Sequence, residues 1–478
     1  MTNTLHLAID LGATSGRSIL ATFDGERVEM KELTRFHYPM LPIAGHLYWN
    51  LPYIYQEVLG AMRAAAAYIA ENHLPALSSI GIDTWGVDVA YFYADGSLAG
   101  LPYCYRDTHT EGAYEKFFAD KMPKEELYST TGIQFMDFNT LFQLNTLRNA
   151  GAHVLDAADK ILFMPDALVY MLTGKVVTEF TIASTSQMLN LATGDFDEVL
   201  LHKLGIPRSK FGPIVQPGTV IGTITPELQD ATGLGAVDVI AVAGHDTASA
   251  VIGVPTPDEN YAYLSCGTWA LFGVESPTYD SGDKALAYNF TNEGGIDSTT
   301  RLLKNICGLW VFERVRAELG LQNADISELA ASCLDSDCPS IIDPDHASFA
   351  NPASMVEAIL AYCRENNQPE PKTTADFVRV IYRSLAARVG QVLSWLRELS
   401  PVSVDRLHVI GGGSRNRHLM QMLADETGLP VVAGPAECTA LGNVLVQLRG
   451  KGLAASLKEM RGIAQRSTDT VSFTPATK

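Results

Sequence analysis

The chain has 478 residues, a length that favours two domains over one. Hydrophobic residues make up 47% of it and charged residues 19%, which is typical of a globular protein. The formal net charge of −19 disfavours nucleic acid or an anionic membrane surface as a partner, although a local site can still bind a small anion.

Neither a targeting pattern nor a zinc-binding cysteine pattern is present. The opening residues, MTNTLHLAIDLG, lack the basic and apolar segments of a signal peptide, and no apolar run approaches the roughly 18 residues of a membrane span. The seven cysteines have no CxxC spacing, so we expect free thiols, including Cys333 and Cys338, which are near enough in sequence to pair. We therefore expect a cytoplasmic protein, either a monomer or a homodimer.

The first predicted element is a hairpin in AIDLGATSGRSIL, residues 8–20. An apolar strand ends in Asp10, a loop with Gly12 and Gly16 follows, and a second strand opens with Arg17. Flexible glycine backbone, loop hydroxyls and a guanidinium suit a phosphate, and Asp10 could hold Mg²⁺ through water. The loop matches neither GxxxxGK[ST] nor GxGxxG, and an ordinary hairpin turn is the alternative interpretation.

The next stretch predicts an amphipathic helix over residues 51–73 and strand-like runs over 78–93 and 160–174. The first of these runs contains GIDTWGVD, residues 81–88, which mixes carboxylates with an aromatic ring, as sugar sites do. From these residues alone, a core tryptophan beside a turn glycine is the favoured interpretation.

A third polar stretch follows a strand of buried type, in VIAVAGHDTASAVIGV, residues 239–254. In α/β folds, ligands meet the carboxyl ends of strands. Asp246 would lie there at a helix N-terminus, where the ionised carboxylate is favoured and can take a proton from a substrate hydroxyl. The alternatives are a routine N-cap aspartate and a structural His245.

The second half begins near the break at Pro255–Asn260 and opens with a similar device. In YAYLSCGTWALFGV, residues 261–274, Gly267-Thr268 echoes the loop after Asp10, which suggests a duplicated α/β fold; chance similarity of two hairpins stays equally open. Residues 407–450 predict a strand, glycine turn, helix, strand, turn and helix in succession. Their GGGSRN turn, 411–416, would let a ligand lie against backbone or simply form a tight turn.

Together these stretches resemble the FGGY family of sugar kinases, in the actin/Hsp70-like ATPase superfamily. AIDLGATSGR and GTWALFG are similar to its phosphate motifs, GHDTASAV to the segment with the catalytic aspartate, and GIDTWGVD, YRD, NEGG and KNICGLW to its sugar-side strings. The resemblance implies an α/β fold of two similar ribonuclease-H-like (actin-like ATPase) domains with an interdomain cleft. It places an N-terminal domain at 1–246, a C-terminal nucleotide-binding domain at 256–450 and a tail at 451–478.

The resemblance also implies a role for each matching position. ATP would be bound by Ala13, Thr14, Ser15, Gly16, Arg17, Thr268, Glu313 and Gly412, with Asp10 near Mg²⁺. The sugar would be held by Gly86, His245, Asp246, Thr247 and Asn305, with Asp246 as the base. Glu313 stands where the family pattern has glutamine, and a carboxylate is electrostatically unfavourable beside ATP.

The reaction implied in this way is phosphorylation of L-rhamnulose at its 1-hydroxyl by ATP, because the GIDTWGVD string is similar to members of the family that use this ketose. L-Fuculose, D-xylulose and glycerol are alternative acceptors. An ATPase-fold regulator that hydrolyses ATP without transfer is an alternative of another class, and it would not need Asp246 to face a sugar.

Overall fold

The computed structural model describes residues 3–476, which form two compact units. The first unit runs to Pro257 and also takes Pro277–Arg301 and Thr439–Ser467. The second holds Asp258–Ser276, Leu302–Cys438 and the residues from Thr468 onward. Within residues 3–476, no helix is both long enough and apolar enough to cross a lipid bilayer.

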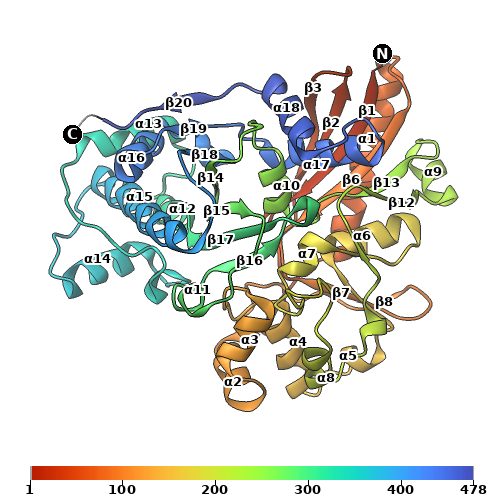
Figure 1. Cartoon of the computed structure of the whole chain (residues 1–478), viewed down its shortest axis with the longest axis horizontal. Coiled ribbons are helices and arrows are strands. Elements are labelled where there is room, and N and C mark those ends of the chain that lie inside the picture. Colours follow the sequence, from red (N-terminus) through yellow and green to blue (C-terminus); the bar gives the residue numbers. More distant parts are fainter. Residues whose placement is uncertain (1–2, 477–478) are drawn as a thin grey trace. The chain divides into compact units, whose positions relative to one another are not determined.

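A six-stranded sheet forms the centre of the first unit, in the order β12-β13-β6-β1-β2-β3 (Figure 1). Its strands are β1 (Thr4–Leu11), β2 (Ser15–Phe23), β3 (Val28–His37), β6 (Leu77–Thr84), β12 (Thr219–Thr223) and β13 (Asp238–Ala241). β1 pairs with β2 in the antiparallel sense, whereas β1, β6 and β13 are parallel neighbours. The carboxyl ends of these three strands therefore meet at one edge of the sheet.

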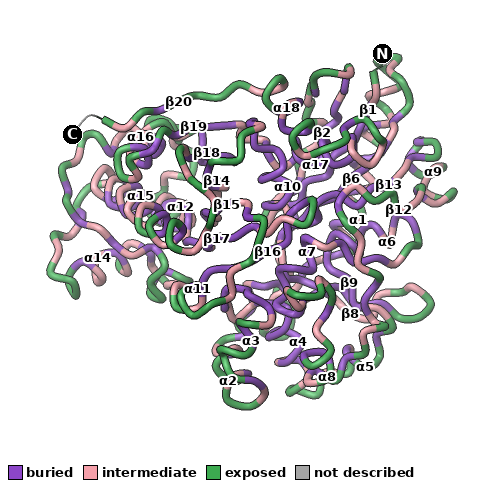
Figure 2. Tube along the Cα trace, in the orientation of Figure 1, coloured by how far each residue is buried: buried purple, intermediate pink, exposed green. Residues whose placement is uncertain are grey.

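Alternation along β1 gives the sheet two apolar faces. Leu5, Leu7, Ile9 and Leu11 are fully buried against α1 (Leu51–Glu71) and α6 (Met164–Thr173), and such a side chain contributes about 1.5–3 kcal/mol by burial. Ala8 points to the other face, which is covered by α10 (Asp246–Ile252), α17 (Cys438–Gly450) and α18 (Leu457–Ser467). Figure 2 shows β1 and β6 buried between these layers.

The predicted helix at 51–73 is confirmed as α1, which begins after Asn50, whose side chain accepts a hydrogen bond from the Tyr53 N–H. The prediction for 160–174 is wrong after four residues. β9 (Lys160–Phe163) is a strand, but α6 follows it directly, with Pro165 in its first turn and Gly174 as a left-handed C-cap. Most of this run is buried on all sides, so its hydrophobic pattern cannot distinguish a strand from a helix.

The remaining elements of the first unit connect and flank this core. The strands are β4 (Leu41–Ile43), β5 (His46–Tyr48), β7 (Val89–Phe92), β8 (Leu98–Gly100), β10 (Thr178–Glu179), β11 (Ile214–Val215) and β16 (Thr291–Gly294). The helices are α2 (Ala113–Asp120), α3 (Lys124–Thr131), α4 (Thr140–Asn149), α5 (Val154–Ala157), α7 (Phe180–Ser184), α8 (Glu198–Leu204), α9 (Pro226–Thr232) and α11 (Asp283–Ala287).

In the second unit, the sheet runs β17-β15-β14-β18-β19-β20. These strands are β14 (Tyr261–Cys266), β15 (Trp269–Ser276), β17 (Thr300–Cys307), β18 (Arg406–Ile410), β19 (Val431–Ala433) and β20 (Val471–Phe473). Its helices are α12 (Trp310–Glu318), α13 (Ile326–Ala331), α14 (Met355–Glu365), α15 (Thr374–Leu399) and α16 (Arg417–Thr427). The succession predicted for 407–450 is confirmed as β18, α16, β19 and α17.

The two sheets share one plan. Each sheet contains an antiparallel hairpin, which is β1–β2 in the first unit and β14–β15 in the second. In the first unit, β1 is followed across the sheet by the parallel strands β6 and β13 and by the antiparallel edge strand β12. In the second unit, β14 is followed in the same way by the parallel strands β18 and β19 and by the antiparallel edge strand β20. This shared topology agrees with the predicted duplication of an α/β fold. The seven cysteines are all free, as predicted, including Cys333 and Cys338.

Candidate active site

Three carboxylates lie at the carboxyl ends of the parallel strands in the first unit. Asp10 and Asp83 occupy paired positions on β1 and β6, and Asp246 follows β13. Asp10 is 6% exposed and Asp83 is fully buried, whereas the Asp246 side chain keeps 30% of its surface exposed. Only Asp246 of the three is therefore open enough to meet a substrate directly.

These carboxylates perturb one another. Burial raises the pKa of Asp83 well above its usual value, and the nearby charge of Asp10 raises it further. A 2.6 Å hydrogen bond donated by Asn443 Nδ2 acts in the opposite direction and lowers this pKa. Burial also raises the pKa of Asp246, with a further contribution from Asp10, while His245 and Thr247 act in the opposite direction. Negative charge is therefore concentrated at the carboxyl ends of β1, β6 and β13, and a bound cation would reduce the repulsion between these carboxylates.

The donor set at this edge fits a magnesium ion. Asp83 Oδ1 is buried and accepts no hydrogen bond from any residue in the described part of the chain. Asp10 Oδ2 is engaged by Arg17, at 2.9 Å from Nε and 2.6 Å from Nη2, which leaves its other oxygen for a ligand. Across residues 3–476, no three His, Cys, Asp or Glu side chains are grouped to hold a metal. Mg²⁺ typically takes one or two carboxylates and keeps several waters, so this arrangement fits it.

The predicted phosphate loop is a tight turn between β1 and β2. The Gly12 N–H donates to the Ser15 carbonyl at 3.0 Å, and the Tyr38 hydroxyl donates to the Gly12 carbonyl. A side chain at Gly16 would come within 2.6 Å of both Phe36 and Leu11, so only glycine fits at this position. The residues predicted to contact phosphate are the turn residues Ala13 and Thr14 and the first residues of β2, Ser15, Gly16 and Arg17.

Trp85 of the GIDTWGVD string belongs to the core. It is 4% exposed, and its ring centroid lies 4.2 Å from that of Trp49. Both indoles donate to Asp88 Oδ2, at 3.0 and 2.6 Å, and Gln143 Nε2 donates to Oδ1 at 2.8 Å. Burial raises the pKa of Asp88 to about 6 despite these donors. The structure therefore supports the core interpretation of this tryptophan.

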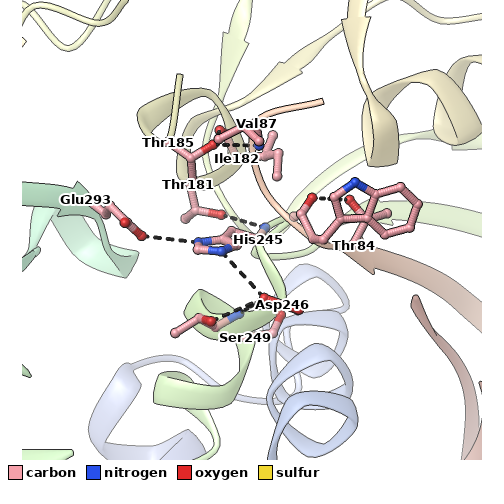
Figure 3. A network of polar contacts seen from close by, with 12 residues as sticks. Thr84, Val87, Thr181, Ile182, Thr185, His245, Asp246, Ser249 and Glu293 are labelled. Carbon is pink, nitrogen blue, oxygen red and sulfur yellow. Dashed lines mark hydrogen bonds and ion pairs between the residues drawn. The ribbon is translucent and has the colours of Figure 1, made fainter. Parts of the chain in front are cut away.

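The backbone after Trp85 is strained beside Gly86, a predicted sugar ligand. Val87 has φ of 68°, an unusual value for a β-branched residue, and its N–H donates to Thr185 Oγ1 at 3.1 Å (Figure 3). Conformations of this kind concentrate at functional sites, where the surrounding structure holds them.

The Gly244–Thr247 turn is fixed from two sides. Thr84 N–H donates to the Gly244 carbonyl at 2.9 Å, and Glu179 Oε2 accepts from the Gly244 N–H at 2.9 Å. Thr181 Oγ1 accepts from the His245 N–H at 3.3 Å (Figure 3). The N-cap of α10 is His245, so the N-cap interpretation of Asp246 is wrong; Asp246 is the first helical residue. Its Oδ1 accepts from the backbone N–H of Thr247, which is 4% exposed.

His245 lies between two acidic groups. Its Nδ1 is 3.2 Å from Glu293 Oε2, and its Nε2 is 3.5 Å from Asp246 Oδ1 (Figure 3). Sequence reasoning considered Asp83 only as one carboxylate of the GIDTWGVD string, and it assigned no individual role to Asp83, to Glu293 or to the Arg301 that pairs with Glu293. The strings GIDTWGVD and NEGG contained the two acids, but no local signal marks Arg301.

Two predicted nucleotide positions occupy turns in the second unit. Thr268 is exposed in the β14–β15 turn, where the Gly267 N–H donates to the Trp269 carbonyl at 2.8 Å. Gly412 is exposed and borders open space, while its neighbour Gly413 packs against Cys266. The turn after β18 therefore exposes backbone with no side chain above it, which a ligand could approach closely.

The other predicted positions of the second unit lie on β17 and on α12. Asn305 is half-buried on β17. Glu313 lies in the first turn of α12, where Arg316 Nη2 binds its carboxylate at 2.6 Å. This ion pair partly neutralises the charge that makes Glu313 unfavourable beside ATP.

Family models match both halves of the chain. The N-terminal domain of the FGGY family of carbohydrate kinases matches residues 5–253, and its C-terminal domain matches residues 262–450. A rhamnulokinase of Bacteroides thetaiotaomicron is 49% identical, over 98% of this chain and 95% of that relative. A rhamnulokinase of Pectobacterium atrosepticum is 41% identical, over 98% and 92% respectively.

Solved structures share the fold at low identity. Gluconate kinase from Lactobacillus acidophilus superposes with a TM-score of 0.82 at 17% identity, over 99% of this chain and 94% of that one. Plasmodium falciparum glycerol kinase with ADP gives 0.80 at 16% identity, over the same shares. The family models and the near full-length relatives establish that this chain belongs to the FGGY family of carbohydrate kinases.

Proposed function

We propose that this protein transfers the γ-phosphoryl group of ATP to O1 of L-rhamnulose, giving L-rhamnulose 1-phosphate and ADP. The observation that carries the proposal is the placement of Asp246, a partly exposed carboxylate with a raised pKa beside His245, at the same strand edge as Asp10. Relatives at 49% and 41% identity that are rhamnulokinases support the choice of ketose.

Asp246 acts as the general base in this proposal. Its carboxylate takes the proton of the sugar 1-hydroxyl while O1 bonds to the γ-phosphorus and the bond from that phosphorus to the bridging oxygen breaks, which releases ADP. The raised pKa makes Asp246 a stronger base than an exposed aspartate, provided that it is ionised at the working pH. The backbone N–H of Thr247, which donates to Oδ1, holds the carboxylate in place.

The phosphates of ATP are assigned to two glycine turns. In the first unit, the backbone and hydroxyls of Ala13, Thr14, Ser15 and Gly16 and the guanidinium of Arg17 would bind phosphate oxygens. In the second unit, Thr268 would contact phosphate, Gly412 would lie beside the nucleotide, and Glu313 is the remaining nucleotide position. Asp10 would hold Mg²⁺ through water, and this ion supplies neutralisation of phosphate charge when bound.

The sugar is assigned to the strand edge of the first unit and to one residue of the second. Gly86, His245 and Thr247 would contact its hydroxyls together with Asp246, and Asn305 would do so from β17. We also propose that the enzyme works in the cytoplasm, as a monomer or a homodimer, without a nucleic-acid or membrane partner. Light scattering of the purified protein measures its oligomeric state.

ADP release measured with L-rhamnulose, L-fuculose, D-xylulose and glycerol tests the proposal. We expect the fastest turnover with L-rhamnulose, and phosphorus NMR of the product should place the phosphate on O1. Asp246→Asn should lower kcat by about 10²–10⁴-fold, the usual contribution of a general base. Asp238→Asn is a matched control, because it removes a carboxylate that pairs with Lys451 at 2.6 Å.

Two results would redirect the proposal. Faster turnover of another acceptor would keep the kinase activity and change its substrate. Equal ADP release with and without any sugar would favour an ATPase that does not transfer the phosphoryl group, and wild-type activity of Asp246→Asn would remove that residue from the role of base.

A further inference from the structure

We propose that a buried chain of hydrogen bonds holds the carboxyl group of Asp83 in place for a divalent cation. This chain, which we call the amide chain, consists of His6, Ser79, Gln447, Asn443 and Asp83. Its positioning residues are the two amides, Asn443 and Gln447. The inference rests on the proposed function for the cation that accompanies ATP, but the amide chain itself is a property of the free protein.

The members of the amide chain come from β1, β6 and α17 and follow one another without a gap (Figure 1). His6 Nδ1 lies 2.7 Å from Ser79 Oγ, and Ser79 Oγ donates to Gln447 Oε1 at 2.7 Å. Gln447 Nε2 donates to Asn443 Oδ1 at 2.7 Å, and Asn443 Nδ2 donates to Asp83 Oδ2 at 2.6 Å. All five residues are fully buried, so water competes little for these hydrogen bonds.

The main-chain carbonyl of Leu7 fixes the direction of the amide chain. A carbonyl oxygen can only accept, so the atom of Gln447 that lies 3.1 Å from it must be the amide nitrogen. Oε1 of Gln447 then faces Ser79, and it can only accept the hydroxyl proton of that serine. Ser79 Oγ is left to accept from His6 Nδ1. Every hydrogen bond of the chain therefore points toward Asp83, and bonds aligned in this way strengthen one another.

The last bond of the amide chain determines which oxygen of Asp83 is available to a ligand. Oδ2 accepts from Asn443, whereas Oδ1 is buried and has no hydrogen-bond partner within residues 3–476. Asp10, at the paired position of β1, is held in a similar way, because Arg17 binds its Oδ2. Each carboxyl group therefore has one oxygen engaged by a fixed donor and another that can bind Mg²⁺ or one of its waters.

Two glycines make room for the amides of α17. A Cβ atom at Gly81 of β6 would come within 2.5 Å of Asn443 Oδ1 and 2.9 Å of Gln447 Nε2. A Cβ atom at Gly442 of α17 would overlap the carbonyl oxygen of Ser249 in α10. Because glycine allows both approaches, α17 lies close enough to the sheet for its amides to reach β1 and β6.

Binding of Mn²⁺ to the complex of the enzyme with ADP tests the positioning role without any sugar. Mn²⁺ prefers the same oxygen ligands as Mg²⁺, and electron paramagnetic resonance measures its free concentration. Gln447→Met keeps the length of the side chain, removes the donor to Asn443 and leaves Asp83 untouched. We expect the affinity for Mn²⁺ to fall about 10-fold in Gln447→Met and up to about 100-fold in Asn443→Leu, the range for partners that orient metal ligands. The affinity for ADP without a metal ion should stay unchanged.

Two further variants separate positioning from a general loss of packing. Ser79→Ala breaks the amide chain further from Asp83 and keeps the bonds made by both amides, so its loss of Mn²⁺ affinity should be smaller than that of Gln447→Met. Gln421→Met is the matched control, because the Gln421 amide donates to a side chain and a carbonyl outside the amide chain, and it should keep the wild-type affinity. Wild-type affinity in both amide variants, or equal losses in all three variants of the chain, would overturn the inference.

Nitrogen NMR of protein labelled with ¹⁵N-histidine tests the direction of the amide chain and needs no change to either amide, so it serves even if the amide variants do not fold. Burial lowers the pKa of His6 to about 4, and its ring therefore carries one proton at neutral pH. That proton should be on Nδ1, which donates to Ser79, while Nε2 accepts from Thr4 Oγ1 at 3.0 Å. His6→Gln identifies the signal. A proton on Nε2 instead would reverse the bond to Ser79 and overturn the inference.

The inference and the proposed function fail in different experiments. If the wild-type protein binds Mn²⁺ with ADP but phosphorylates no sugar, the proposed function is refuted, while a loss of Mn²⁺ affinity in the amide variants still supports the amide chain. If it phosphorylates L-rhamnulose and both amide variants keep the wild-type affinity for Mn²⁺, the inference alone is refuted. Absence of Mn²⁺ binding by the wild-type complex with ADP would overturn both.

Discussion

The hairpins that open the two units have the same topology but different chemistry. β1 ends in Asp10, which pairs with Arg17 and lies beside Asp83 on the neighbouring parallel strand. β14 ends in Cys266, a buried free thiol, and the glycine turn after its parallel neighbour β18 packs against that thiol. Titratable groups therefore gather at the carboxyl ends of the strands in the first unit, which we call the first edge. The corresponding strand ends in the second unit, the second edge, present backbone and small side chains.

The two copies of one scaffold therefore offer different chemistry at the carboxyl ends of their parallel strands. The first edge has the carboxylates that a proton transfer and a metal ion require. The second has the close backbone approach that suits a nucleotide. The predictions for Asp83 and Gly413 test whether charge matters in the first unit and packing in the second, and those for His6 and Glu313 test charged or titratable groups elsewhere in the two units.

Among the variants compared below, the largest effect should come from replacing the buried carboxyl group of Asp83. Asp83→Asn keeps the size of the side chain and an acceptor for Asn443, but it ends the repulsion with Asp10 and Asp246. We expect kcat to fall about 100-fold, because this edge of the sheet loses a carboxylate that fits a magnesium ion, while the melting temperature rises. Steady-state kinetics and calorimetry measure the two effects.

The equivalent change in the other hairpin is the matched control. Cys266→Ala should leave kcat close to that of the wild-type protein, because no charge is lost. If Cys266→Ala were as damaging as Asp83→Asn, the chemical difference between the edges would not explain their roles.

The next effect concerns His6, which is buried on β1 and hydrogen-bonded to Ser79 Oγ at 2.7 Å. Burial lowers the pKa of His6 from 6.5 to about 4, with a smaller contribution from the charge of Lys451. Between these pH values the unfolded chain binds a proton that the folded chain does not, so the free energy of unfolding should fall as the pH drops. The loss attributable to His6 is about 3 kcal/mol.

Urea unfolding at a series of pH values measures this slope, and His6→Gln should flatten it between pH 6.5 and about 4. An unchanged slope in the variant would show that other groups cause the acid sensitivity.

A packing change should have a moderate effect at the second edge. A side chain at Gly413 would come within 2.4 Å of Cys266 Sγ, so Gly413→Ala should lower the free energy of unfolding by about 2 kcal/mol. Urea denaturation and calorimetric titration with ADP would report stability and nucleotide affinity. Gly412→Ala, which borders open space, should match the wild-type stability.

The Gly413 effect should be partly reversed by a second substitution. Cys266→Ala removes the sulfur that the new methyl group meets, so the double variant should regain stability relative to Gly413→Ala alone. Equal losses in the single and double variants would locate the strain elsewhere.

The smallest effect should come from Glu313, whose side chain is 43% exposed and paired with Arg316. Glu313→Gln should change the free energy of unfolding by less than about 1 kcal/mol, as is usual for a surface ion pair. If Glu313 lies near bound ATP, KM for ATP should fall by about twofold, because a repulsive charge is removed. A rise in KM would instead indicate that the carboxylate contributes a favourable contact.

Local signals explain what the sequence predicted correctly. The hairpin turns, the helix that begins after Asn50 and the succession of elements over 407–450 are each defined by residues adjacent in sequence. The two sheets have a similar strand order because each combines such a hairpin with parallel strands from later in the chain. The position of Asp246 after a strand of buried type was predictable for the same reason.

The rest depends on contacts between distant residues. Asp83 and Asn443 are 360 positions apart, and His245 contacts Glu293, which lies on the distant strand β16. The helix at 164–173 was missed because burial on most sides leaves no polar face to mark its period. A single sequence carries no signal for such pairings, so the buried cluster beside His245 appears only in the structure.

The return of α17 to the first unit affects the order in which the site can assemble during synthesis. Asn443 reaches Asp83, and Gln447 donates to the Leu7 carbonyl from one turn further along that helix. A ribosome that has released only the first 257 residues has therefore not yet supplied the amide that supports Asp83. We expect the strand edge that contains Asp83 to mature only after α17 has been synthesised.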